Sequence, residues 1–289
     1  MKYQIEIFTA FDGQLSLAGW VETAATKLTL HLDDGQIIEV PTVRDGLIAR
    51  FHLRSAYSSI TPYNAELHVG QEAIGQLYST VDLAHGLYPR FFEALPKTGA
   101  LLEIGSRARS GFSRREMTPA GWTYTGLDVL DGENVDVVGD AHRLSKLFPD
   151  QRFDAVLSVS VLEHILMPWK LAIEMNRILN VGAVGFFMTH QGWPLHDAPW
   201  DFWRFSDQAW RALFNPATGF EIIEAHMGDP VYMVPRHLHA ACAYGMDYLS
   251  YGASAVLFRK ISETTLEWPV ELEDIITTSY PSTTGIYTG

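Results

Sequence analysis

The stretch LLEIGSRARSG, Leu101–Gly111, decides how the fold of this chain is interpreted. Its apolar first half is typical of a buried strand, and Gly105 then allows the backbone to turn sharply and to approach a ligand closely. Further glycines follow such a turn in many nucleotide-binding α/β units. Arg107 and Arg109 stand at those positions here. Because residues other than glycine must avoid strained backbone angles, this loop cannot copy the usual geometry closely.

Strand and helix patterns alternate around this loop. HILMPWKLAIEMNRILN has helical periodicity, and DLAHGLYPRFFEALP predicts a helix interrupted by Pro89. Parallel strands joined by helices predict an open α/β sheet with helices on both faces and ligands at the carboxyl ends of the strands. The expected strands are LLEIG, WTYTGLDVL, VDVVGD, FDAVLSVSV, AVGFFMTH, GFEIIEAHMG and SAVLFRKI.

The residues before Asp82 have a different character. Short β-branched or aromatic segments such as IEIFTAF, LSLAGWV and KLTLHL are separated by turns such as DG and DDG, which predicts a small antiparallel sandwich. The last segment, TTSYPSTTGIYTG, is small and polar and is expected to be a disordered tail. The expected domains are an all-β sandwich-like domain at residues 1–82, an α/β domain at 83–262 and a C-terminal tail at 263–289.

The composition is that of a globular protein with a sizeable core, since 47% of the residues are hydrophobic and 19% are charged. A formal net charge of -13 would repel phosphate backbones, so nucleic acid is not expected as a partner. The single cysteine, Cys242, excludes an internal disulfide. The first residues lack the apolar core of a signal peptide, and no apolar run is long enough to cross a bilayer. We therefore expect a cytoplasmic protein without stable membrane insertion.

Acidic side chains follow two of the expected strands. Asp128 comes about two dozen residues after Gly105, the separation at which a carboxylate binds the ribose hydroxyls of a nucleotide. Asp140 follows VDVV and could accept a hydrogen bond from an adenine amino group, with Ala141 against the ring. Each carboxylate also has a structural interpretation, because Asp128 could stabilise a turn and Asp140 could cap the helix that AHRLSKLF predicts.

The fourth strand leads into the most specific string of the chain, FDAVLSVSVLEHI. The order of these features resembles a class I S-adenosylmethionine-dependent methyltransferase over roughly Leu101 to Lys260, and is closest to the group whose fourth strand ends in VLEH. The resemblance implies a Rossmann-like sheet, S-adenosylmethionine as the cofactor, and a mostly structural role for Glu163 and His164. A nicotinamide enzyme is less favoured because the full G-x-G-x-x-G is absent. The cofactor-binding residues that the resemblance implies are Glu103, Gly105, Ser106, Asp128, Asp140, Ala141, Ser158 and Val159.

Arg107 and Arg109 replace the second and third glycines of the family pattern E-x-G-x-G-x-G, and Arg114 and Arg115 follow close behind them. Ser113 and Glu116 have the spacing of a capping box, so a short helix is expected to begin at Ser113. Cations are unfavourable at a helix N-terminus, so this cluster in an acidic protein predicts a bound anion. We expect Arg107, as a cofactor-binding residue, or Arg109 to pair with the cofactor carboxylate or with a phosphate on the substrate. The alternative is that the arginines, Arg107, Arg109, Arg114 and Arg115, face solvent or pair with surface acids.

An aromatic and polar segment, HQGWPLHDAPWDFWRFSDQAWRALF, follows the strand AVGFFMTH. Tryptophan faces beside carboxylates and imidazoles suit sugar rings, and such density after a strand end favours a binding site. The segment resembles the H-D-x-P-x-D-x-W-R-F stretch of methyltransferases found among polysaccharide-biosynthesis enzymes, which implies a glycan or similar small-molecule substrate. The alternative is a packed lid with core tryptophans and a structural ion pair between Asp201 and Arg204. The four tryptophans are Trp193, Trp200, Trp203 and Trp210.

Methyl transfer to a hydroxyl needs a group that removes its proton. A histidine is well suited to that role near neutral pH, so we expect His190 or His196 to be the catalytic base, with Asp197 orienting it or substituting for it. These three residues could also hold a divalent metal. The spacing H-x5-H-D matches no strong ligand motif, so no metal site is expected.

The sequence thus predicts an S-adenosylmethionine-dependent methyltransferase that O-methylates a saccharide or a similar small polar acceptor. The alternative is a non-catalytic binding or scaffolding module with a decayed cofactor site. Asp128 and Asp140 favour the enzyme, because a decayed site has no need of both carboxylates. The sandwich domain could hold glycan, dock a glycosyltransferase or form a homodimer, and its sequence does not decide between them.

Overall fold

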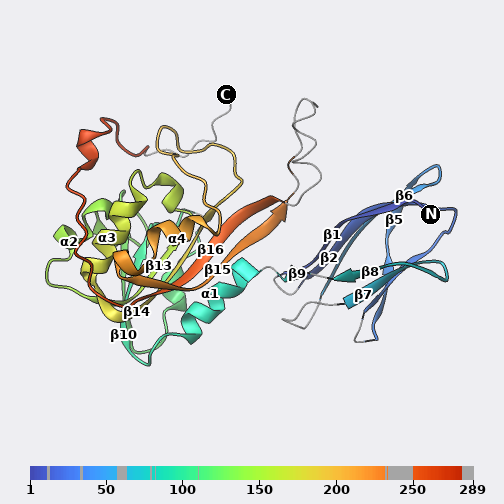
Figure 1. Cartoon of the computed structure of the whole chain (residues 1–289), viewed down its shortest axis with the longest axis horizontal. Coiled ribbons are helices and arrows are strands. Elements are labelled where there is room, and N and C mark those ends of the chain that lie inside the picture. The colour runs from blue at the N-terminus through green and yellow to red at the C-terminus, as the bar shows by residue number, and fades with distance from the viewer. Residues whose placement is uncertain are drawn as a thin grey trace. The chain divides into compact units, whose positions relative to one another are not determined.

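The computed structural model describes residues 1–11, 14–32, 35–56, 64–78, 80–81, 83–109, 111–231, 233 and 250–281. The chain forms two compact units, Met1–His85 and Gly86–Gly289, which Figure 1 traces from blue to red. The boundary expected from the sequence, between residues 82 and 83, falls at the start of helix α1 (Leu83–Glu93).

Two sheets form the first unit, with the strand orders β5-β6-β2-β1-β9 and β4-β3-β7-β8. Leu15 and Leu17 of the first sheet share one buried core with Leu30 and Leu67 of the second. The apolar faces of the two sheets therefore meet, as the alternating sequence pattern predicts for a sandwich. The strands are β1 (Tyr3–Phe11), β2 (Gln14–Glu22), β3 (Leu28–Leu32), β4 (Ile37–Val40), β5 (Thr42–Asp45), β6 (Ile48–Ala56), β7 (Asn64–Val69), β8 (Glu72–Tyr78) and β9 (Thr80–Val81).

Seven strands form the sheet of the second unit, in the order β12-β11-β10-β13-β14-β16-β15. Neighbours from β12 to β14 are parallel, whereas β16 lies between β14 and β15 and is antiparallel to both. The sheet is therefore mixed: the strands from β12 to β14 have the expected parallel arrangement, and β16 adds antiparallel pairings that the sequence pattern left open. The strands are β10 (Gly99–Ile104), β11 (Trp122–Asp128), β12 (Val137–Val138), β13 (Phe153–Val159), β14 (Leu179–His190), β15 (Phe220–Val231) and β16 (Ser250–Lys260).

Helices cover both faces of this sheet. Successive residues of a strand point to opposite faces, and Phe186 and Phe187 of β14 show which helices lie on each. Phe186 contacts Tyr88 and Phe91 of α1, whereas Phe187 packs in the core that includes α3 (Pro168–Ile178) and α4 (Ala209–Leu213). Among the described residues, no helix is long and apolar enough to span a membrane.

Two prolines mark where the helices differ from the sequence prediction. Pro89 lies inside α1, which continues to Glu93 without the expected interruption. The helix lacks the hydrogen bond that proline cannot donate there. Helix α3 begins at Pro168 rather than near His164, which suits proline because the first helical N–H has no partner within the helix.

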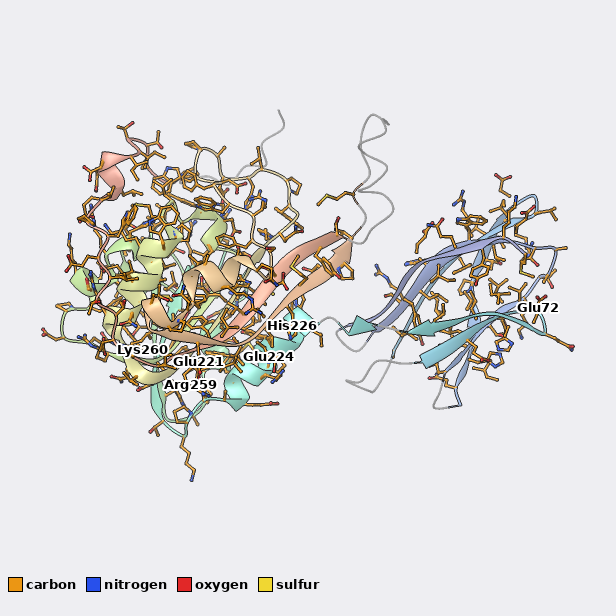
Figure 2. The ribbon with its side chains drawn as sticks, in the orientation of Figure 1. Glu72, Glu221, Glu224, His226, Arg259 and Lys260 are labelled. Atoms are coloured by element: carbon orange, nitrogen blue, oxygen red, sulfur yellow. The ribbon has the colours of Figure 1, made fainter. Side chains whose placement is uncertain are left out.

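The segment 263–281 packs on the second unit, so the disordered tail expected for residues 277–289 is wrong for its first part. Lys260, labelled in Figure 2, anchors its start, since the buried ammonium donates to the carbonyls of Asn176 and Leu179 and to Glu263. Further along, Glu271 accepts from Lys170 at 3.0 Å. Residues 282–289 lie outside the described part of the chain.

Candidate functional site

A cavity of about 390 Å³ opens at the carboxyl ends of β10, β11, β13 and β14. Strands β11 and β12 follow β10 on one side of it in the sheet, whereas β13 and β14 lie on its other side. The strand order therefore reverses between β10 and β13. Ligands of open α/β sheets bind in the crevice that this reversal leaves. The volume lies in the range of small-molecule sites.

Gly105 forms the first wall of the cavity at the end of β10. Its φ of +79° is a left-handed conformation, and a Cβ placed there would lie 2.1 Å from Cγ2 of Val161, which also lines the cavity. The N–H groups of Gly105 and Ser106 both donate to the carbonyl of Leu127, at 2.8 and 3.0 Å. Only glycine therefore fits this turn, even though the following glycines of the family pattern are replaced.

Asp128 follows at the end of β11 and also lines the cavity. One carboxylate oxygen accepts from the N–H of Leu130 at 2.9 Å, and the other accepts from the N–H of Arg107 at 3.3 Å. The side-chain Nε of Arg107 lies 3.8 Å from Asp128. The backbone thus fixes this carboxylate at the cavity wall, where lone pairs remain for a diol.

Asp140 and Ala141 line the cavity at the end of β12. Oδ1 of Asp140 accepts from the N–H and from Nδ1 of His142, at 2.9 and 2.6 Å, so Asp140 caps a short 3-10 turn while its other oxygen stays available. Nε2 of His142 accepts from the N–H of Met167, which fixes the proton on Nδ1. Burial would raise the pKa of Asp140, but the hydrogen bonds from His142 outweigh it and hold that pKa below its usual range.

Three of the residues expected to bind the cofactor, Glu103, Ser106 and Ser158, do not line the cavity, whereas Val159 does. Glu103 is buried and accepts from Arg114 at 3.2 Å, and burial raises its pKa. Ser158 donates its hydroxyl to the carbonyl of Ile104 at 3.0 Å. The hydroxyl of Ser106 is buried and has no hydrogen-bond partner among the described residues. Glu103 and Ser158 therefore stabilise the ends of β10 and β13 through these contacts.

The four arginines of the first loop each have an acidic partner in the structure. The pairs are Arg107–Asp128, Arg109–Asp197, Arg114–Glu103 and Arg115–Asp136. The expected helix is a 3-10 turn at Arg114–Met117, and Ser113 precedes it without a side-chain cap. Because the protein's own carboxylates neutralise the cluster, its charge alone no longer calls for an external anion. Arg107 and Arg109 nevertheless line the cavity.

The far end of the cavity carries His190 and His196, the two residues expected to include the base. His190 ends β14, and its ring stacks on Trp193 at 4.9 Å between centroids. Burial lowers the pKa of His190 although Glu163 is close. The N–H of His196 donates to Asp201 at 2.9 Å, and this carboxylate is also held by Arg204, the structural ion pair expected from the sequence.

Asp197 is buried next to the cavity but does not line it. Its carboxylate accepts from Arg109 and from the hydroxyl of Tyr280, each at 2.7 Å. Burial would raise the pKa of Asp197, but these two hydrogen bonds lower it below its usual range. Burial, followed by the bond to Asp197, raises the pKa of Tyr280, so the phenol stays protonated and acts as a donor.

The four tryptophans of the aromatic segment divide between site and core. Trp193 and Trp200 line the cavity, and Trp193 remains 56% exposed. Trp210 is fully buried in the core of the second unit. Trp203 is partly exposed and donates to the carbonyl of Leu166 at 3.3 Å, so the packed interpretation holds for part of the segment.

Three residues of this site were not predicted from the sequence. His142 orients Asp140, and a histidine two residues after a capping aspartate was the available signal. Glu163 lies behind His190 and was expected to be only structural. Tyr280 lines the cavity from a segment expected to be disordered, and nothing in its local pattern indicated this position.

Residues 78–226, just over half of the chain, match the family model described as a methyltransferase domain. The chain belongs to this family of methyltransferase domains. It is an S-adenosylmethionine-dependent methyltransferase, as the order of the strand-end motifs predicted. No curated protein sequence matches the chain.

Solved structures with similar folds include an S-adenosylmethionine-dependent methyltransferase from Archaeoglobus fulgidus, at 14% identity and a TM-score of 0.44, over 62% of this chain and 93% of that one. The YcgJ protein of Bacillus subtilis has 17% identity and a TM-score of 0.44, over 62% and 99%. The [4+2]-cyclase SpnF has 19% identity and a TM-score of 0.42, over 61% and 81%. These scores lie below 0.5, so the assignment rests on the family match.

Proposed function

We propose that this methyltransferase transfers a methyl group from S-adenosylmethionine to a hydroxyl of a saccharide or a similar small polar acceptor. The exposed face of Trp193, stacked on His190 at the cavity, is the observation that carries this proposal. A sugar ring has apolar C–H faces and polar hydroxyl edges. A flat indole beside imidazoles therefore suits it better than an apolar slot does.

The wall residues support one orientation of the cofactor. The second oxygen of Asp140 is available for the adenine amino group, and Ala141 lies beside it. Asp128 would accept from the ribose hydroxyls, and the turn at Gly105 would hold the methionine part. Arg107 is placed to contact that part as well. This order directs the sulfonium methyl group toward the end of the cavity that carries the histidines.

The chemistry is a displacement at the methyl carbon. The acceptor oxygen forms a bond to that carbon, the carbon–sulfur bond breaks, and its electron pair passes to sulfur. The hydroxyl must lose its proton during this step. We assign its activation to His190 and His196, which reach the cavity, and a positioning role to Asp197, which holds Arg109 and Tyr280 at its edge.

A transfer assay with labelled S-adenosylmethionine and a panel of monosaccharides, oligosaccharides and nucleotide sugars tests the acceptor class. Trp193→Ala should raise the KM for the saccharide while leaving the affinity for the cofactor unchanged. Trp268→Ala is the matched control, because Trp268 is similarly exposed but does not line the cavity. Transfer only to non-saccharide acceptors, or an unchanged KM in Trp193→Ala, would contradict the proposal.

A non-catalytic role is not favoured, because the family match and the cavity-facing carboxylates Asp128 and Asp140 both indicate a working cofactor site. The described residues that line the cavity belong to the second unit. For the sandwich unit we propose a contact with glycan, with a glycosyltransferase or with a second copy of the chain.

A further inference from the structure

Glu163 presents an unsatisfied carboxylate oxygen beside the acceptor end of the cavity. The side chain is fully buried, and Oε2 accepts a hydrogen bond from the hydroxyl of Thr189. Oε1 has no hydrogen-bond partner among the described residues. A buried oxygen of an ionised carboxylate is costly unless a donor or a cation faces it.

Three imidazole nitrogens face this oxygen. Nε2 of His190 lies 3.2 Å from Oε1, Nε2 of His164 lies 3.8 Å away, and Nε2 of His196 lies 3.9 Å away. The contact with His190 is close, but it lacks the geometry of a hydrogen bond, so it does not satisfy Oε1. Four atoms that can donate lone pairs thus converge from η3 (Leu162–His164), β14 and the loop after it.

The hydrogen bonds of the other ring nitrogens determine which nitrogens carry protons. Nδ1 of His164 lies 2.6 Å from the carbonyl of Trp200, and Nδ1 of His196 lies 3.1 Å from the carbonyl of Pro194. A carbonyl only accepts, so both Nδ1 atoms are donors. In the neutral rings the Nε2 atoms are then unprotonated. Metal-binding histidines are commonly oriented by such carbonyls.

The simplest alternative to a bound cation is a proton on Nε2 of His190, which would face Oε1 of Glu163. The contact between Nε2 of His190 and Oε1 of Glu163 lacks the geometry of the hydrogen bond that such a proton would make. The distances fit a metal ion instead, since tetrahedral bonds of about 2.0–2.1 Å place ligand atoms about 3.3 Å apart. The ligand atoms of Glu163, His190 and His196 all lie within 4.8 Å of one another.

We propose that Glu163, His190 and His196 bind a divalent transition-metal ion of the zinc class at the acceptor end of the cavity. His164 lies close enough to become a fourth ligand. A second set, His164, His196 and Asp197, is less suitable because Arg109 and Tyr280 already occupy the Asp197 carboxylate. Imidazole nitrogens with one carboxylate are a donor set that zinc and its neighbours accept.

Two of the three proposed ligands line the cavity, so an acceptor hydroxyl could approach the ion from the open side. With the ion bound, His190 and His196 would activate such a hydroxyl as metal ligands and not as bases, because a divalent ion lowers the pKa of the hydroxyl and the proton would leave to water before the oxygen attacks the methyl carbon. This catalytic role rests on the proposed function, whereas the binding of the ion does not. This metal site could not be predicted from the sequence, because Glu163 lies far along the chain from His190 and His196.

Calorimetric titration of the tag-free, chelator-treated full chain with Zn²⁺ tests the site, and visible absorption of the Co²⁺-loaded chain tests its ligand geometry. We expect one ion per chain. His190→Asn and Glu163→Gln should each weaken Zn²⁺ binding by at least about 100-fold, since even loss of an orienting partner costs roughly 10–100-fold. The matched controls are His226→Asn and Glu221→Gln, which alter residues of β15 outside the cavity and should bind Zn²⁺ as the unaltered chain does.

Circular dichroism of each variant shows whether it is folded. If Glu163→Gln fails to fold, the effect of His190→Asn on Zn²⁺ binding tests the site instead, because His190 is partly exposed. Absence of Zn²⁺ binding, or binding that neither His190→Asn nor His196→Asn weakens, would overturn the proposal. A separate titration of the chelator-treated chain with S-adenosylhomocysteine reports on the cofactor site alone, so failure of the metal site and failure of the methyltransferase function are distinguishable.

Discussion

Substitution of Gly105 by alanine tests the turn on which the cofactor site is built. The residue has a φ of +79°, a conformation that costs a residue with a Cβ about 1–2 kcal/mol. The new Cβ would also lie 2.1 Å from Cγ2 of Val161. Overpacking of this kind typically costs about 1–3 kcal/mol. Together these effects should lower the free energy of unfolding by about 2–5 kcal/mol, a large part of the stability of an ordinary domain.

Gly182→Ala is the matched control for this prediction. Gly182 has a φ of +93°, but nothing lies within 4 Å of the position of its Cβ, so only the backbone cost of about 1–2 kcal/mol applies. Urea unfolding followed by circular dichroism gives both free energies. A second variant, Gly105→Ala with Val161→Ala, removes the methyl groups that collide, and should lose less stability than the two single variants added together.

A Gly105→Ala variant that is no more destabilised than Gly182→Ala would show that the collision with Val161 does not affect stability. Calorimetry with S-adenosylhomocysteine extends the test from stability to function. Because Gly105 and Val161 both line the cavity, Gly105→Ala should weaken binding whereas Gly182→Ala should not. Equal affinities in the two variants would mean that the cofactor does not contact this turn.

Three further predictions concern single side chains. Asp128→Ala should weaken S-adenosylhomocysteine binding roughly tenfold to a hundredfold in calorimetry, because hydrogen bonds to a charged group contribute about 1.5–3 kcal/mol; an unchanged affinity would exclude the ribose role. Tyr280→Phe removes the donor to Asp197 and should lower kcat with little change in cofactor affinity; an unchanged kcat would reject its role. Bonds from Lys146, Lys170 and Arg143 lower the pKa of Glu271 from 4.5 to about 2. This lowered pKa stabilises the folded state above about pH 4.5, and the contribution is lost as the pH falls toward 2. Proteolysis of the segment 263–281 should therefore rise over that range, and a flat profile would contradict it.

The strand-end motifs could be predicted because each depends on local chemistry. A glycine after a buried strand, and a carboxylate at the end of the next, keep their positions in any sheet that places parallel strands side by side. Gly105, Asp128, Asp140 and Ala141 accordingly line one cavity. The antiparallel position of β16 was not predictable in this way, since the pattern of an apolar strand does not record its direction.

The acceptor end could not be predicted in the same detail, because distant segments build it. Asp197 was expected to orient the catalytic histidine or to substitute for it, but its pairing with Arg109 and Tyr280 involves residues far away in sequence. The ion pairs of the first loop could not be predicted for the same reason, since Asp128, Asp136 and Asp197 come from other segments. The sequence also does not show that Oε1 of Glu163 is buried without a hydrogen-bond partner, because this depends on how the three imidazoles are placed around it.

A crystal structure of the chain with S-adenosylhomocysteine tests the central claim most directly. We predict that adenine contacts Asp140 and Ala141, that the ribose hydroxyls bind Asp128, and that the sulfur points toward His190. Density for the ligand outside this cavity, or in the opposite orientation with adenine at the histidines, would contradict the account.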